Sequence, residues 1–171
     1  MDDKYRDLLK QIEELKEQVE KLGKKPATTG KSEEKIAAKK TKKSGGKDYE
    51  WVGKRILVVE DNDVNYLVLQ NMLKPTNAQI IWAKGGRMAI EICKSAKDIN
   101  IVLMDIMIPN FDGITTTKKI KELHPDLPVI IQTAYPSPEN KSRCEESGCS
   151  GFLEKPVKKA ELLETINEHI L

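Results

Sequence analysis

The stretch Ile101-Val102-Leu103-Met104-Asp105 consists of four apolar residues followed by a carboxylate. A continuous apolar run of this length is typical of a strand that is buried on both faces, as in a parallel sheet. Pro109 and Gly113 follow in a segment where the chain turns away from the strand. We therefore expect Asp105 at the carboxyl end of a strand, where open α/β sheets place their ligand sites. The alternative is that Asp105 only caps the strand.

From residue 55 onward, apolar segments of this kind alternate with amphipathic segments. The pattern predicts strands over 55–59, 78–83, 101–104, 128–133 and 151–154. It predicts helices over 64–73, 87–95, 114–123, 137–147 and 158–170. Strict alternation of this kind indicates an α/β domain with a five-stranded parallel sheet and right-handed crossovers.

Two of the predicted helices carry apolar residues at helical spacing that we take as candidates for core contacts. In the helix over 64–73 they are Val64, Leu67, Val68, Met72 and Leu73. In the helix over 87–95 they are Met88, Ile90, Ile92 and Cys93. A stripe of this kind normally faces the core.

The first 22 residues have a different pattern. Apolar residues recur at alternating steps of three and four, namely Tyr5, Leu8, Ile12, Leu15, Val19 and Leu22. This is a heptad seam, and β-branched residues at a with leucine at d favour a parallel two-stranded coiled coil. A helix of this length is marginal alone in water. We expect residues 1–22 to form a coiled coil that makes a homodimer; the alternative is an amphipathic helix lying on the domain.

Residues 23–50 are rich in Lys, Ser, Thr, Gly and Ala and carry almost no large apolar side chains. Such a segment buries too little surface to offset its ordering entropy, so we expect a flexible linker before a domain over 51–171. The lysines suggest nucleic acid as an alternative partner, through counterion release. No aromatic or arginine side chain is interleaved with them to stack on bases, which favours the linker.

The composition of the chain fits a protein of the cytoplasm. No apolar run approaches the roughly 20 residues needed to cross a bilayer, and the N-terminus lacks the apolar core of a signal peptide. The chain has three cysteines, an odd number without zinc-like spacing, which indicates reduced thiols. Cys144 and Cys149 could form a redox pair, but small buried apolar residues are the simpler interpretation.

Chemistry-bearing residues follow four of the five predicted strands. Glu60 and Asp61 follow the first strand, Asp105 ends the third, Thr133 ends the fourth and Lys155 follows the fifth. The carboxyl ends of parallel strands lie along one edge of the sheet, so these side chains should converge. Three carboxylates together repel one another, and Mg²⁺ removes that conflict. A lysine and a hydroxyl beside them supply donors for phosphoryl oxygens, so the set predicts phosphoryl transfer to a carboxylate.

Over residues 54–171 the chain resembles the receiver domain of two-component response regulators, in particular receivers attached to hybrid sensor kinases. The segments that carry the resemblance are Ile56-Leu57-Val58-Val59-Glu60-Asp61-Asn62, Leu103-Met104-Asp105 followed by Pro109 and Asp112-Gly113, Thr133-Ala134, and Gly151-Phe152-Leu153-Glu154-Lys155-Pro156. The resemblance implies a flavodoxin-like, doubly wound (βα)5 fold.

The resemblance also implies roles for individual residues. Asp105 would accept a phosphoryl group from a phosphohistidine on a histidine kinase or histidine phosphotransfer protein. Glu60, Asp61 and Asp105 would bind Mg²⁺, with the backbone carbonyl of Met107 as a further ligand. Lys155 would pair with Asp105 and then with the phosphoryl oxygens. No ATP-binding motif is present in the sequence, so the donor would act in trans.

A second group of residues would convert phosphorylation into a signal. The resemblance implies that Thr133 moves to hydrogen-bond the phosphoryl group and that Phe152 rotates inward behind it. Pro156 would follow Lys155 through a cis peptide bond. The output surface would comprise the last helix, the fifth strand and the helix before that strand, and it would contact other proteins.

Some positions depart from the common pattern of the family or bear on alternatives. Met107 and Tyr135 are large, weakly polar residues that would flank the path of attacking water, and we expect them to prolong the phosphorylated state.

Two alternative functions are less consistent with the sequence. A phosphatase similar to the haloacid dehalogenases would need an aspartate at position 107, where this chain has methionine. A pseudo-receiver, a binding module without phosphorylation, typically lacks one of the acidic pair, the acceptor or the lysine, all of which are present here.

Overall fold

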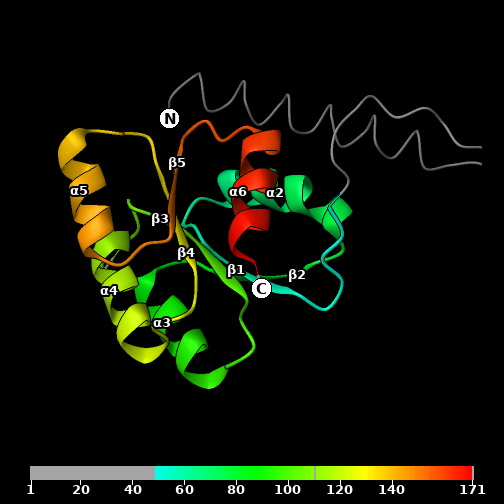
Figure 1. Ribbon diagram of the computed structural model, residues 1–171, viewed down its shortest axis with the longest axis horizontal. Coiled ribbons are helices and arrows are strands. Elements are labelled where there is room, and N and C mark those ends of the chain that lie inside the picture. Colours follow the sequence, from blue (N-terminus) through cyan, green and yellow to red (C-terminus); the bar gives the residue numbers. More distant parts are fainter. Residues whose placement is uncertain (1–48, 110, 171) are drawn as a thin grey trace, which may run out of the picture. The chain divides into compact units, whose positions relative to one another are not determined.

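Five parallel strands form the centre of the structure, a computed structural model that describes residues 49–109 and 111–170 (Figure 1). They are β1 (Arg55–Val59), β2 (Gln79–Ala83), β3 (Ile101–Asp105), β4 (Val129–Thr133) and β5 (Gly151–Glu154). Their spatial order is β2-β1-β3-β4-β5, which is the flavodoxin-like order. The predicted parallel five-stranded sheet is therefore confirmed. The predicted coiled coil over 1–22, and the predicted linker up to residue 48, lie outside the described residues.

Helices cover both faces of the sheet (Figure 1). The helical elements are α2 (Asp63–Leu73), the 3-10 turn η1 (Lys74–Thr76), α3 (Gly86–Ser95), α4 (Gly113–Leu123), α5 (Pro138–Glu146) and α6 (Lys159–His169). Helices α2 and α6 share one apolar core with the sheet, and α3, α4 and α5 share the other. Each strand therefore alternates its side chains between two cores, which makes the sheet doubly wound.

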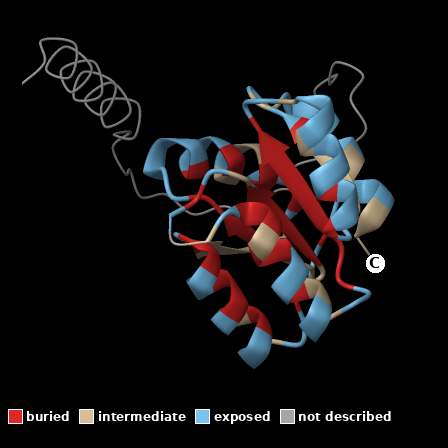
Figure 2. Ribbon diagram, turned by 90° about the vertical axis from the view of Figure 1, so that its left-hand side faces the viewer, coloured by how far each residue is buried: buried red, intermediate tan, exposed pale blue. Residues whose placement is uncertain are grey.

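The central strands are buried along their whole length, as Figure 2 shows in red. In β3 the four apolar residues from Ile101 to Met104 are fully buried, and Asp105 is 7% exposed. Val102 and Met104 face the core of α3, α4 and α5, whereas Ile101 and Leu103 face the core of α2 and α6. Burial on both faces explains why this strand is a continuous apolar run rather than an alternating one.

Helix α2 turns only part of the expected face to the core. Of the candidate core residues, Val64, Leu67 and Val68 are 59%, 52% and 47% exposed. The residues that face the sheet are Tyr66 and Leu69, which were not candidates, together with the candidate Leu73, and the candidate Met72 is partly buried. The helix is apolar around most of its circumference, so periodicity alone could not select the buried stripe. Met88 of α3 is likewise exposed, whereas Ile90 and Cys93 are buried as expected.

The two helices that follow β1 and β3 begin at side-chain caps. Asn62 accepts hydrogen bonds from the backbone N–H groups of Val64 and Asn65 at the start of α2. Asp112 caps α4 through the N–H of Thr115. These caps fix where each helix begins and leave Glu60, Asp61 and Asp105 uninvolved in capping.

Within the part of the chain that the structure describes, no helix has both the length and the apolar character required to cross a membrane.

Candidate functional site

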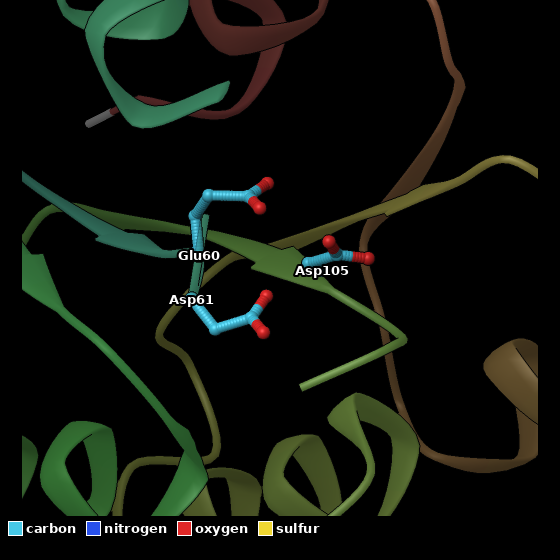
Figure 3. A group of neighbouring side chains, drawn as sticks. All are labelled: Glu60, Asp61 and Asp105. Atoms are coloured by element: carbon cyan, nitrogen blue, oxygen red, sulfur yellow. The ribbon is translucent and has the colours of Figure 1, made fainter. Parts of the chain in front are cut away.

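Three carboxylates converge at the carboxyl ends of β1 and β3 (Figure 3). Glu60 and Asp61 follow β1, and Asp105 ends β3, the neighbouring strand in the sheet. One carboxylate oxygen from each residue lies within 4.8 Å of the others. Glu60 and Asp105 are buried and Asp61 is exposed, so the cluster opens to solvent on one side. The structure therefore brings together the three acidic residues that the sequence suggested.

Lys155 reaches the same cluster from the end of β5. Its Nζ donates hydrogen bonds to Asp105 Oδ2 at 2.6 Å and to Glu60 Oε2 at 2.7 Å. Burial lowers the pKa of Lys155, but the hydrogen bonds and charges of Asp105 and Glu60 raise it, and the net pKa lies above the ordinary lysine value. Lys155 is therefore held as a cation between two carboxylates.

Glu60 is 1% exposed and is held by several donors. Its Oε1 accepts hydrogen bonds from the side chain of Asn65 at 3.0 Å and from the backbone N–H of Asn62 at 3.3 Å. The indole Nε1 of Trp82, in β2, donates to the Glu60 backbone carbonyl at 2.8 Å. Sequence reasoning did not identify Asn65 or Trp82 as part of the site. The sequence holds a local signal for Asn65, because a side chain one turn into a helix can reach back to the start of that helix. It holds no such signal for Trp82, which lies on a different strand.

Asp105 is fixed by the loop that follows it. The backbone N–H of Met107 donates to Asp105 Oδ1 at 3.0 Å. Helix α4 begins against the backbone of Asp105: a Cβ at Gly113 would lie 2.1 Å from the Asp105 carbonyl oxygen. No side chain larger than hydrogen fits there without moving the loop. Gly113 is thus required for the close approach of α4 to the strand end.

Thr133 ends β4, and Phe152 is the second residue of the neighbouring strand β5. Thr133 is 2% exposed, and its Oγ1 accepts a hydrogen bond from the N–H of Tyr135 at 3.1 Å. Phe152 is half-buried against the core of α3, α4 and α5, with Lys141 Nζ 5.8 Å from its ring centroid. Among the described residues, Thr133 makes no hydrogen bond to Asp105. The Lys155–Pro156 peptide bond is cis, as the resemblance implied.

The donor set of the cluster fits a hard divalent cation. Mg²⁺ prefers oxygen ligands from one or two carboxylates, together with water and phosphate oxygens. The exposed carboxylate of Asp61 makes the cluster accessible to such an ion. Lys155 pairs with two of the three carboxylates, so the cluster retains net negative charge that a cation would offset.

A family model described as the response regulator receiver domain matches residues 56–167, more than half of the chain. The chain belongs to the response regulator receiver family. Among curated relatives, this receiver domain is 34% identical over 116 residues to a cyclic di-GMP phosphodiesterase of Thermotoga maritima and 36% identical over 120 residues to the osmosensing histidine protein kinase SLN1 of Saccharomyces cerevisiae. The matches cover 68% and 67% of this chain but only 30% and 10% of those proteins.

Solved structures agree with this assignment. The receiver domain of a sensor histidine kinase from Pseudomonas aeruginosa, with a magnesium ion in its active-site cleft, is 29% identical with a TM-score of 0.64. That match covers 69% of this chain and 98% of the other. A Saccharomyces cerevisiae receiver, solved together with a histidine phosphotransfer protein, is 27% identical with a TM-score of 0.63 and matches over 68% of this chain and 88% of that one. The receiver domain therefore takes part in two-component signalling.

Proposed function

We propose that Asp105 accepts a phosphoryl group from a phosphohistidine carried by a histidine kinase or a histidine phosphotransfer protein. The observation that carries the proposal is the contact of Lys155 with Asp105 Oδ2, beside two further carboxylates within 4.8 Å. A structural ion pair would need only one carboxylate per lysine. A lysine paired with two carboxylates, with a third carboxylate beside them at a strand edge open to solvent, suits a site that takes up a phosphoryl group and a cation.

The transfer proceeds by attack of an Asp105 carboxylate oxygen on phosphorus. The bond between phosphorus and the imidazole nitrogen of the donor breaks, and that nitrogen keeps the electron pair. The product is an acyl phosphate on Asp105, and hydrolysis by water later returns the carboxylate and releases inorganic phosphate. Lys155 already contacts Asp105 Oδ2 and, as a cation, stabilises negative charge that develops on the phosphoryl oxygens. The receiver would in this sense catalyse its own phosphorylation and dephosphorylation.

Mg²⁺ would be held by Asp61 and Asp105, with Glu60 and the backbone carbonyl of Met107 completing the set. When bound, the ion supplies positive charge that stabilises the phosphoryl oxygens in the transition state. Glu60 has the weakest claim to direct ligation, because its carboxylate accepts three hydrogen bonds from the protein, against two at Asp105, and because it is the more deeply buried of the two. Its buried charge still strengthens the attraction of the site for a cation.

The switch would run through Thr133 and Phe152. In the structure described here the Thr133 hydroxyl bonds to the Tyr135 N–H, and phosphorylation would draw it toward the new phosphoryl oxygens. Movement of Thr133 would vacate space for the half-buried ring of Phe152. The surface formed by α5, β5 and α6 would then differ between the two states and be recognised by a protein partner in the cytoplasm.

The deciding experiment is incubation of the full chain with acetyl phosphate and Mg²⁺, followed by intact-mass measurement. The wild-type protein should gain one phosphoryl group, and the Asp105→Asn variant should gain none. Asp126→Asn, an exposed aspartate outside the cluster, is the matched control and should behave as wild type. Absence of the adduct in the wild-type protein, or its persistence in Asp105→Asn, would overturn the proposal and favour a pseudo-receiver.

A further inference from the structure

Asn65 is the third residue of α2, and its side chain reaches back to the carboxylate cluster. Its Nδ2 donates a hydrogen bond to Glu60 Oε1 at 3.0 Å. The same oxygen accepts a bond from the backbone N–H of Asn62 at 3.3 Å, and the other oxygen, Oε2, accepts one from Lys155. Within the part of the chain that the structure describes, Asn65 is therefore the only side chain that donates to Glu60 Oε1.

Asn65 accounts for the difference between Glu60 and Asp105 in their hydrogen bonds. Asp105 accepts one bond from a backbone N–H, that of Met107, and one from Lys155. Glu60 accepts the same two kinds of bond and, in addition, the bond from the Asn65 amide. Without that amide, the two buried carboxylates would have equivalent sets of donors. A carboxylate oxygen must give up or share its donors to bind a metal ion, and Asn65 makes this change more costly for Glu60 than for Asp105.

The chemical type of residue 65 also bears on the charge of the cluster. Glutamate or glutamine is common at the third position of a helix, where its side chain accepts a hydrogen bond from the start of the helix. A glutamate at this position would put a fourth carboxylate beside Glu60 and add repulsion. The asparagine amide instead supplies a donor and carries no charge. It therefore fixes Glu60 without offsetting the negative charge that attracts a cation.

We propose that Asn65 is a positioning residue that makes the carboxylate cluster select Mg²⁺ over Ca²⁺. The inference rests on the proposed binding of Mg²⁺ and deepens it. Mg²⁺ keeps several water molecules and binds one or two carboxylates, whereas Ca²⁺ takes roughly six to eight oxygen ligands, often from bidentate carboxylates. While Asn65 holds Glu60, the cluster offers Asp61 and Asp105 as direct ligands, which suits the smaller ion. Release of Glu60 would add a third carboxylate and favour Ca²⁺.

The test compares two asparagine-to-alanine variants of α2 in the full chain. Asn65→Ala removes the donor to Glu60, and Asn71→Ala makes the same change at an exposed position further along the helix. Alanine favours a helix more than asparagine does, so both variants should fold. Mg²⁺ and Ca²⁺ are titrated separately, and each dissociation constant is measured by two-dimensional amide NMR. The constant for Mg²⁺ divided by that for Ca²⁺ should rise roughly two- to tenfold in Asn65→Ala, the factor of one hydrogen bond, and should not change in Asn71→Ala.

A third variant, Asn65→Gln, keeps the amide donor on a longer side chain, and the ratio of the two constants should return toward the wild-type value. A merely structural role of Asn65 would weaken the binding of both ions alike in Asn65→Ala and leave the ratio unchanged. That result, or an equal rise of the ratio in Asn71→Ala, would overturn this inference, while Mg²⁺ binding by the wild-type protein would still support the proposed function. Binding of neither ion to the wild-type protein would overturn the magnesium site itself and the inference with it.

Discussion

Trp82 and Glu60 are joined by a hydrogen bond of 2.8 Å from the indole Nε1 to the backbone carbonyl oxygen. The indole makes two further contacts. It stacks on the ring of Tyr66, with centroids 4.0 Å apart and planes 2° from parallel, and Lys84 Nζ lies 4.4 Å from its centroid. Strand β2 and helix α2 thereby hold the backbone that carries Glu60 and Asp61.

We predict that Trp82→Phe weakens Mg²⁺ binding. The substitution keeps an aromatic ring beside Tyr66 but removes the donor to the Glu60 carbonyl. The dissociation constant should rise roughly two- to tenfold, the factor that corresponds to loss of about 0.5–1.5 kcal/mol. Isothermal titration of the full chain with Mg²⁺ measures it. Trp51→Phe, at a buried tryptophan outside the site, is the control; equal affinities in both variants would contradict a positioning role for Trp82.

Gly113→Ala should both destabilise the protein and reduce phosphorylation of Asp105. The new methyl group would lie 2.1 Å from the Asp105 carbonyl oxygen, so α4 and the loop must separate. Overpacking of this kind costs about 1–3 kcal/mol. Gly85→Ala is the matched control, since its Cβ would make ordinary contact at 3.5 Å. Urea unfolding measures the free-energy change; equal stability of the two variants would show that the contact relaxes without cost.

Lys155→Met should destabilise the protein at neutral pH by about 1–3 kcal/mol, because two buried carboxylates lose their shared cation. The pKa of Lys155 is raised in the folded state, so its contribution is fully present below the ordinary lysine pKa of 10.5. It is lost as pH rises through the higher folded-state pKa. The difference between wild type and variant, measured by urea unfolding, should therefore be constant from pH 7 to about pH 10 and shrink above it.

Lys84→Met is the control for that experiment. Lys84 forms an exposed ion pair with Asp63 at 2.7 Å, and exposed pairs contribute about 0–1 kcal/mol. A larger loss of stability in Lys84→Met than in Lys155→Met would mean that the pairing of Lys155 is not what stabilises the site.

The exposed side chains of Met107 and Tyr135 should prolong the phosphorylated state. Their side chains are 64% and 65% exposed, and their backbone N–H groups bond to Asp105 and Thr133. Polar replacements, Met107→Asn and Tyr135→Glu, would offer groups that orient attacking water. The phosphoryl lifetime, followed by intact mass after removal of the donor, should fall severalfold in each. An unchanged or longer lifetime would refute the role of these two residues.

Cys93 and Cys144 should react slowly with Ellman's reagent in the folded protein at pH 8. Burial raises the pKa of both thiols to about 11, so very little thiolate is present at that pH. Cys149 is half-buried with a raised pKa, chiefly through burial, and should react first. All three should react at once in urea. Rapid reaction of Cys144 in the folded protein would instead support a redox pair with Cys149.

The local sequence was sufficient for the elements and for the convergence of the carboxylates and Lys155. The apolar run before Asp105 predicted a buried strand, and the polar residues at the ends of four of the five strands predicted a converging cluster, of which the carboxylates and Lys155 do meet. Both inferences hold because burial on two faces and the common direction of parallel strands leave a local signature in the chain. The face of α2 was predicted only in part: Leu73 is buried as expected, but Val64, Leu67 and Val68 are exposed although they have the same local signal.

Tertiary structure alone decided which partners meet. Lys155 lies 95 positions after Glu60, yet its Nζ lies 2.7 Å from Glu60 Oε2. The two side chains meet because the parallel strands, in the order β2-β1-β3-β4-β5, end along one edge of the sheet. The bond from Trp82 to Glu60 likewise depends on neighbouring strands and on the helix packed over them. Periodicity records how much of each side chain is buried, whereas the identity of its neighbours is set by the order in which the strands assemble.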